Sequence, residues 1–225
     1  MRTREEVWQY ISEIGIVPVV RAPSPELAIA AAKAVCAGGI PIVEITMTVP
    51  GAISVIQELK QSMGRQILVG AGTVLGAETA ARCLDAGAEF LVSPGFDFET
   101  VKLANLQEKL IIAGALTPTE VITAWKAGSD FVKVFPCGNV GGAGYIRALR
   151  AALPQIPMVP TGGVNLETAA DFLCAGASAF GVGGELISAA AMKSGNWDAI
   201  TETARLFVTI VRQARGIAND SAAND

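Results

Sequence analysis

The sequence predicts a (β/α)8 barrel, a ring of eight parallel strands in which each strand is followed by a helix. Short β-branched apolar runs alternate with longer helical patterns along all 225 residues, and roughly 200–250 residues is the length that eight such units need. Helical patterns also end repeatedly in an Ala-Gly pair followed by a strand, so the chain looks internally repetitive. An open doubly wound sheet is the alternative, but it usually has fewer strands and a stronger dinucleotide fingerprint.

The expected strands are continuous apolar runs, as in parallel strands that are covered on both faces. They are Ile16–Val20, Ile40–Thr46, Ile67–Gly70, Phe90–Ser93, Leu110–Ala113, Phe131–Phe135, Met158–Pro160 and Ala179–Val182. Apolar residues make up 51% of the chain, yet no run approaches the ~20 apolar residues that a membrane-spanning helix needs. We therefore expect no membrane partner.

Helix starts carry recognisable capping residues. Ser24 and Thr117 each precede a proline at the first helical position, and Asn165 is expected to open the seventh helix. Helix ends at Ala37-Gly38, Ala86-Gly87, Ala127-Gly128 and Ala175-Gly176 place glycine where a left-handed cap is wanted.

The domain organisation is expected to be simple. Residues 3–13 predict an extra amphipathic helix that closes the amino-terminal end of the barrel. Residues 1–215 form one barrel domain, and residues 216–225 form a frayed, flexible tail.

Composition excludes several function classes. A net charge of −4 without a Lys/Arg cluster disfavours nucleic-acid binding. The start of the chain lacks the apolar core of a signal peptide, and the four cysteines form no CxxC pair, so we expect a cytoplasmic protein with reduced thiols. The chain contains no histidine, which excludes a Ser-His-Asp triad and His-ligated zinc. We expect no metal and no cofactor, and chemistry carried by lysine, carboxylates, hydroxyls and backbone groups.

Lys133 is the most informative single residue. It lies within an apolar strand, and alternation points it to the same face as Phe131 and Phe135, with Val132 and Val134 on the other. One interpretation is a lysine that reaches solvent or pairs with a carboxylate. The other is a desolvated lysine that is available as a neutral amine to attack a carbonyl.

Glu44 presents the same alternatives in the second strand. A buried carboxylate costs several kcal/mol unless it is paired. A Lys133–Glu44 pair across the barrel would satisfy both groups, and an amine with a nearby general acid/base is also what a Schiff-base enzyme needs.

Other candidates follow the carboxyl ends of strands, where barrel active sites lie. Arg21, Thr73 and Pro94 follow the first, third and fourth strands. Gly162-Gly163 and Gly183-Gly184 follow the seventh and eighth strands, where backbone N–H groups commonly bind phosphate. The alternative for these glycines is a role in tight turns alone.

Six ordered motifs together resemble the 2-keto-3-deoxy-6-phosphogluconate / 4-hydroxy-2-oxoglutarate aldolase family. They are Val43–Thr46, Gly70–Leu75, Ser93–Gly95, Thr117–Glu120, Val132–Pro136 and Pro160–Gly163. The resemblance implies a metal-independent class I aldolase, a homotrimer, that acts on small 2-keto acids. It would cleave 2-keto-3-deoxy-6-phosphogluconate to pyruvate and glyceraldehyde 3-phosphate, 4-hydroxy-2-oxoglutarate to pyruvate and glyoxylate, or both.

The resemblance also implies a role for each matching residue. Lys133 matches the Schiff-base lysine and Glu44 the general acid/base. The positions of Arg21 and Thr73 match residues near the pyruvate carboxylate. Pro94 and Phe135 match a pocket wall. The phosphate-side loop is matched by Thr161, Gly162 and Gly163.

Three positions depart from the family pattern. Many members have arginine where this chain has Thr48, serine within the stretch Gly183-Gly184-Glu185, and Pro-Gly at Ala113-Gly114. The aldolase chemistry looks intact, while the site for the distal end of the substrate is altered. The alternative function is a phosphate-binding barrel, an isomerase or synthase or a non-catalytic scaffold, in which Lys133 and Glu44 form only a buried ion pair.

Overall fold

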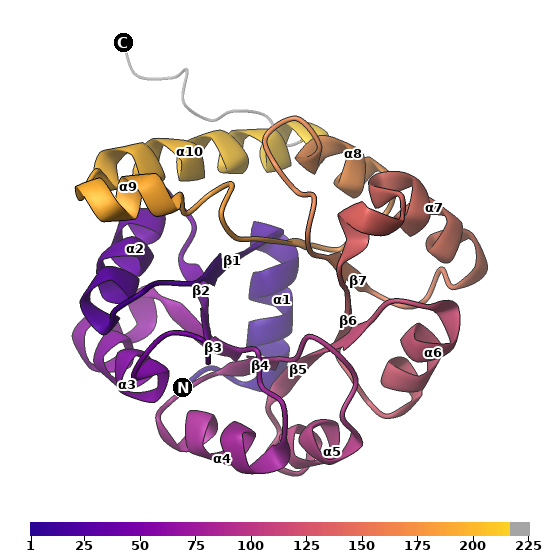
Figure 1. Ribbon diagram of the computed structural model, residues 1–225. Helices are drawn as coiled ribbons and strands as arrows, with labels where there is room; N and C mark the ends of the chain where they lie inside the picture. Colours follow the sequence, from indigo (N-terminus) through magenta and orange to yellow (C-terminus); the bar gives the residue numbers. More distant parts are fainter. Residues whose placement is uncertain (217–225) are drawn as a thin grey trace.

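The computed structural model describes residues 1–216, and in it eight parallel strands form a ring in the order β7-β6-β5-β4-β3-β2-β1-β8 (Figure 1). A parallel bridge between Thr161 and Gly181 joins the two ends of this order and closes the ring. The fold is the predicted (β/α)8 barrel with an additional amino-terminal helix. Residues 217–225 of the expected tail lie outside the described residues.

The strands are β1 (Ile16–Val20), β2 (Ile42–Thr46), β3 (Leu68–Gly72), β4 (Phe90–Val92), β5 (Leu110–Ala115), β6 (Phe131–Val134), β7 (Met158–Pro160) and β8 (Phe180–Val182). The α-helices are α1 (Arg4–Ile14), α2 (Pro25–Ala37), α3 (Ala52–Met63), α4 (Ala77–Asp85), α5 (Phe98–Leu106), α6 (Pro118–Lys126), α7 (Gly142–Ala152), α8 (Ala169–Cys174), α9 (Ala189–Ser194) and α10 (Trp197–Ala214). Two 3₁₀ turns, η1 (Gly64–Gln66) and η2 (Cys137–Val140), follow α3 and β6. No α-helix among residues 1–216 is long and apolar enough to cross a membrane.

Alternation along the strands divides the apolar residues into two clusters. Val132 and Val134 of β6 belong to the cluster between the strands and the outer helices. Phe131 belongs to the cluster inside the barrel, together with Ile42 and Phe90. The predicted faces of β6 are therefore confirmed.

Two strands, β3 and β5, extend beyond their predicted carboxyl ends, because glycine is a poor strand former when judged from sequence alone. β3 continues to Gly72 and β5 to Ala115, each two residues beyond the predicted end. The β2 ladder begins only at Ile42. Phe135 lies just beyond β6, although its N–H still donates to the carbonyl of Ala115.

Two predicted helix boundaries are also wrong. Gly38 has φ −79°, and the left-handed residue after α2 is Gly39, with φ 92°. Asn165 does not open a helix: its carboxamide oxygen accepts from the N–H groups of Glu167 and Thr168 and closes a turn, and α8 begins at Ala169. In both cases a local turn displaces the boundary by a few residues.

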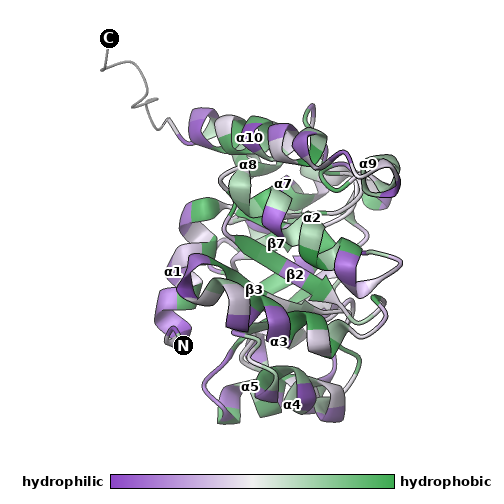
Figure 2. Ribbon diagram, turned by 90° about the vertical axis from the view of Figure 1, so that its left-hand side faces the viewer, coloured by the Kyte–Doolittle hydropathy of each residue, from purple (hydrophilic) through white to green (hydrophobic). Residues whose placement is uncertain are grey.

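Helix α1 closes the amino-terminal end of the barrel, as predicted, and is seen through the ring in Figure 1 and across one end of the molecule in Figure 2. A capping box between Thr3 and Glu6 begins it. Val7 and Ile11 are buried in the interior apolar cluster, and Trp8 stacks on Phe131 with ring centroids 5.5 Å apart.

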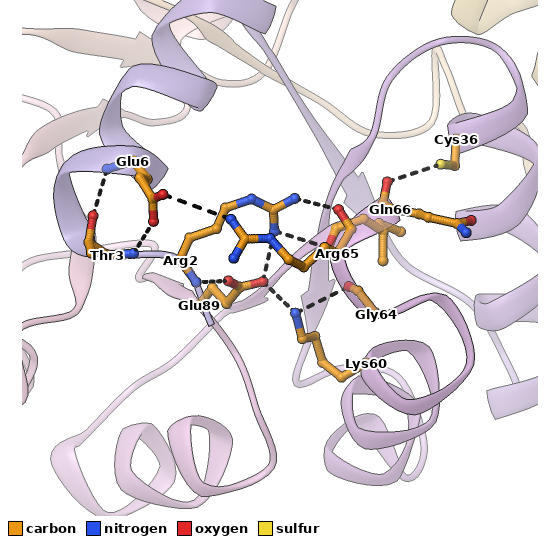
Figure 3. Close-up of polar contacts among 10 residues, drawn as sticks. Arg2, Thr3, Glu6, Cys36, Lys60, Gly64, Arg65, Gln66 and Glu89 are labelled. Atoms are coloured by element: carbon orange, nitrogen blue, oxygen red, sulfur yellow. Dashed lines mark hydrogen bonds and ion pairs between the residues drawn. The ribbon is translucent and has the colours of Figure 1, made fainter.

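A buried carboxylate fastens this helix to the barrel. Glu89, at the start of β4, accepts from the backbone N–H of Arg2 at 2.9 Å and pairs with the guanidinium of Arg2 and the ammonium of Lys60 (Figure 3). The Glu89 side chain is 1% exposed. The segment before α1 is therefore held by a doubly paired internal charge.

Candidate active site

Lys133 of β6 and Glu44 of β2 meet inside the barrel. Lys133 Nζ lies 3.8 Å from Glu44 Oε1, and the two side chains are 5% and 2% exposed. Both residues occupy inward strand positions above the interior apolar cluster. The pairing expected from the sequence is therefore present.

Glycines on the neighbouring strands leave room for this pair. A Cβ atom at Gly72 would lie 1.9 Å from Glu44 Oε1, and one at Gly70 would lie 2.3 Å from the Phe90 ring. Glu44 and Gly70 are register partners in the β2–β3 ladder. The interior of β3 therefore carries no side chain beyond Leu68, and the Glu44 carboxylate fills that space.

One carboxylate oxygen of Glu44 is unsatisfied. Glu44 Oε1 is buried and accepts no hydrogen bond among the described residues, and the 3.8 Å separation from Lys133 Nζ exceeds hydrogen-bond length. Buried polar atoms are normally hydrogen-bonded, so an exception calls for an explanation. An open acceptor next to an amine is the arrangement that a proton-transferring pair needs.

A cavity of about 200 Å³ opens at the carboxyl ends of β1, β6, β7 and β8. We call it the distal cavity. Seven of the predicted substrate-binding residues line it: Arg21, Phe135, Thr161, Gly162, Gly163, Gly183 and Gly184. Four further residues complete the lining: Val19, Val164, Gly181 and Glu185. Alternation in the first and eighth strands is the signal that would have placed Val19 and Gly181 on the inner face.

Three glycines that line this cavity have backbone N–H groups without partners among the described residues. Gly162 and Gly163 have φ values of 88° and 79°, a conformation that side chains rarely adopt. The N–H groups of Gly162, Gly163 and Gly184 donate no hydrogen bond within residues 1–216. Consecutive free N–H groups in turns of this kind bind anions.

A second cavity of about 390 Å³ lies at the ends of β4, β5 and β6. Pro94 and Phe135 line it as predicted, together with Phe96 and Leu116. The Phe135 ring centroid lies 5.5 Å from Lys133 Nζ. Because Phe135 lines both cavities, it stands between them and next to the amine.

Thr73 lies at the end of β3 and lines neither cavity. Its φ of 56° is positive, and a β-branched residue in this region is a genuine outlier. Strained residues cluster at functional sites, where the surrounding structure holds them. Thr73 directly follows Gly72, the residue that makes room for Glu44.

A larger cavity, about 550 Å³, lies at the opposite end of the barrel beside α1. Two charged residues that line it, Arg4 and Asp130, already pair with each other at 2.7 Å. The active sites of (β/α)8 barrels lie at the carboxyl ends of the strands. We therefore place the candidate site at the Lys133 end. Residues 1–216 contain no cluster of three or more His, Cys, Asp or Glu residues suited to a metal ion.

Two buried cysteines, Cys83 and Cys137, do not compete with Lys133 as nucleophiles. All four cysteines are free thiols, and burial raises the pKa of Cys83 and of Cys137 to about 11. At neutral pH these two groups remain protonated and unreactive.

Comparison with known proteins gives a consistent result. Residues 7–203 match the model of the KDPG and KHG aldolase family. The KHG/KDPG aldolase of Escherichia coli is 34% identical over 84% of this chain and 89% of its own length. The 2-dehydro-3-deoxy-phosphogluconate aldolase of Treponema pallidum is 31% identical over 91% of this chain and 97% of its own. A crystal structure of the KDPG aldolase of Legionella pneumophila, with pyruvate captured as a covalent carbinolamine intermediate, superimposes with a TM-score of 0.82 at 30% identity, over 88% of this chain and 96% of that one. The chain belongs to the KDPG and KHG aldolase family.

Proposed function

We propose that this aldolase cleaves 2-keto-4-hydroxy acids through an imine on Lys133, with Glu44 as the general acid and base. The observation that carries the proposal is the buried pair itself. An amine and a carboxylate lie 3.8 Å apart, and the carboxylate oxygen nearest the amine has no hydrogen-bond partner within residues 1–216. Neither group lines a cavity itself, but Phe135, whose ring centroid is 5.5 Å from the amine, lines both cavities.

In the first half of the reaction, the neutral Lys133 amine attacks the C2 carbonyl of the substrate and gives a carbinolamine. Loss of water from the carbinolamine gives an iminium. Glu44 holds and returns the protons that these steps release and consume. Burial of both groups strengthens their electrostatic influence on the reacting atoms, because the local dielectric constant is low.

In the second half, the Glu44 carboxylate takes the proton of the C4 hydroxyl as the C3–C4 bond breaks. The electron pair of that bond moves into the iminium, which becomes an enamine, and the aldehyde leaves. Protonation of the enamine at C3 and hydrolysis of the imine release pyruvate and restore Lys133. General acid–base assistance of this kind contributes about 10²–10⁴-fold.

The substrate-binding roles follow from the two cavities. We assign Pro94 and Phe135 to the wall beside the reacting carbons. Thr73, which lines neither cavity, keeps the place near the pyruvate carboxylate that the resemblance implies. Arg21, for which the resemblance implies the same place, lines the distal cavity, and we assign it to the far end of the substrate. The distal cavity, with Thr161 and its four predicted glycines, receives the group at the far end of the substrate. Substrates under this proposal are 2-keto-3-deoxy-6-phosphogluconate, giving pyruvate and glyceraldehyde 3-phosphate, and 4-hydroxy-2-oxoglutarate, giving pyruvate and glyoxylate.

Reduction with borohydride in the presence of pyruvate, followed by peptide mass mapping, tests the imine. We expect the adduct on Lys133, and we expect Lys133→Met to abolish pyruvate release. Lys102→Met, which changes an exposed lysine of α5, is the matched control and should be trapped and active like the parent. An active enzyme without an adduct on Lys133 would sink the mechanism.

The same variant distinguishes the other class of function. If Lys133 and Glu44 form only a buried ion pair, an apolar replacement of Lys133 can be neutral or stabilising. Activity towards phosphosugars would then survive Lys133→Met. Thermal unfolding measured beside pyruvate release separates loss of chemistry from loss of folding.

We also propose a cytoplasmic homotrimer. Leu75, on the loop that follows β3, and Phe98, the first residue of α5, are 72% and 54% exposed, and exposed apolar side chains of this size are candidates for contact with another copy. Four free thiols suit a reducing compartment. Light scattering after size-exclusion chromatography should give three chains per particle, and Leu75→Asp should dissociate them.

A further inference from the structure

We propose that Glu185 sets the charge that the distal cavity accepts, disfavouring a dianionic phosphate and favouring a distal group that is singly charged or neutral. The inference rests on the proposed function, because it concerns the far end of the same substrate. Under this inference Glu185 determines specificity by lowering kcat/KM for substrates that carry a distal phosphate.

Two residues of opposite charge line the distal cavity. Arg21 and Glu185 are the charged residues that line it among residues 1–216. They form no ion pair within 4 Å, with each other or with any other described residue. Both charges are therefore available to a group that enters the cavity, and together they add no net positive charge.

The backbone fixes Glu185 at the rim of this cavity. The carbonyl of Gly183 accepts from the N–H groups of both Leu186 and Ile187, which closes a turn over Gly184 and Glu185. Leu186 and Ile187 are buried and anchor the far side of the turn. The main chain of Glu185 therefore stays beside the cavity, while its side chain is exposed.

The two substrate classes differ in how strongly Glu185 repels them. A phosphate monoester carries about 1.5 to 2 negative charges at pH 7, whereas a carboxylate carries one and a hydroxyl none. The free N–H groups of Gly162, Gly163 and Gly184 favour any anion, and Arg21 favours it further. Glu185 opposes the anion in proportion to its charge, so its effect is largest for phosphate. At an exposed rim we expect about a tenfold effect on the phosphorylated substrate.

The test compares kcat/KM for 2-keto-3-deoxy-6-phosphogluconate and for the unphosphorylated 2-keto-3-deoxygluconate in three proteins. These are the parent, Glu185→Gln, and Glu167→Gln as the matched control. Glu167 is an exposed glutamate in the turn before α8, at the same end of the barrel but outside the cavity lining. The control therefore removes the same charge without altering the cavity.

We expect Glu185→Gln to raise the preference for the phosphorylated substrate about tenfold, through kcat/KM of that substrate alone, with Glu167→Gln unchanged. Added salt should leave the preference of the parent nearly unchanged, because the opposed charges of Arg21 and Glu185 are screened together. It should lower the preference of Glu185→Gln, because the attraction between Arg21 and the phosphate is then unopposed. An unchanged preference in Glu185→Gln, or an equal rise in Glu167→Gln, would overturn the inference while pyruvate release upholds the proposed function. Absence of pyruvate from both substrates in the parent would overturn both.

Discussion

At the scale of single residues, the candidate site holds groups that are costly to the folded protein. A buried carboxylate and ammonium lose hydration, and their attraction offsets this loss only when their hydrogen bonds are satisfied. Glu44 Oε1 lacks such a bond within the described chain. An apolar pair of similar size would be a better solution for stability alone, which favours a chemical role for Glu44 and Lys133.

Thr73 is a second residue whose conformation works against stability, and it allows a direct prediction. Because φ is 56° at this position, Thr73→Gly should relieve strain and raise the free energy of unfolding by about 1 kcal/mol. For a chain of this size that corresponds to a rise in Tm of roughly 2–4 °C. If Thr73 also contacts the substrate, kcat/KM should fall although the protein is more stable.

Thr73→Ala is the matched variant, because alanine removes the hydroxyl and keeps the backbone strain. It should lose activity like Thr73→Gly but gain no stability. Differential scanning calorimetry and pyruvate release measured on both variants decide the matter. A Tm for Thr73→Gly at or below that of Thr73→Ala would contradict the assignment of strain.

At the scale of elements, the interior glycines of β3 couple the strand to the site. Gly72→Ala places a Cβ atom 1.9 Å from Glu44 Oε1, so the carboxylate has to move. A displacement of about 1 Å at a catalytic group costs on the order of 10²-fold in rate. We therefore expect kcat to fall by about that factor, while imine trapping on Lys133 persists.

Gly76→Ala is the control within the same loop region, since a Cβ at Gly76 meets no atom within 4 Å. It should leave both kcat and Tm close to those of the parent. Full activity in Gly72→Ala would show that the reaction does not depend on the position of Glu44 beside Gly72.

The elements also show how far sequence reasoning reaches. Alternation predicted that Lys133 shares a strand face with Phe131, and the structure shows that this face is the interior of the barrel. The Pro25 and Pro118 positions marked true helix starts.

The ends of β3 and β5 were missed because their glycines have weak local strand preference. The glycines of β3 make room for the side chains of Phe90 and Glu44, and Gly114 of β5 makes room for the backbone of Pro94 and Gly95. All of these contacts are long-range, so the local sequence does not reveal them.

At the scale of the whole molecule, the barrel assembles residues that are remote in sequence. Arg21 and Thr161 line the same cavity because β8 joins β1 to β7 around the ring. The identity of these residues could be predicted, since each follows a strand. The division of the predicted substrate-binding residues between two cavities could not be predicted, because it depends on where the Phe135 side chain lies.

The two ends of the barrel should separate stability from activity, and Glu89 tests this. Its carboxylate is 1% exposed and pairs with Arg2 and Lys60 at the end opposite the candidate site. Glu89→Gln leaves two cations without their buried partner, so we expect a loss of about 3 kcal/mol in the free energy of unfolding. Urea titration measures this loss. Glu6→Gln, which removes an exposed charge that pairs with Arg65, should cost much less.

Activity should be insensitive to the change at Glu89 and sensitive to a change at Glu44. At a temperature where Glu89→Gln remains folded, its kcat/KM should equal that of the parent, because the interior apolar cluster separates Glu89 from Lys133 and that cluster is unchanged. Glu44→Gln should lose about 10²–10⁴-fold in kcat. A large loss of kcat in folded Glu89→Gln would mean that the end of the barrel closed by α1 is coupled to the chemistry at Lys133. The contacts of Glu89 would then affect both the stability of the barrel and the geometry of the candidate site, instead of stability alone.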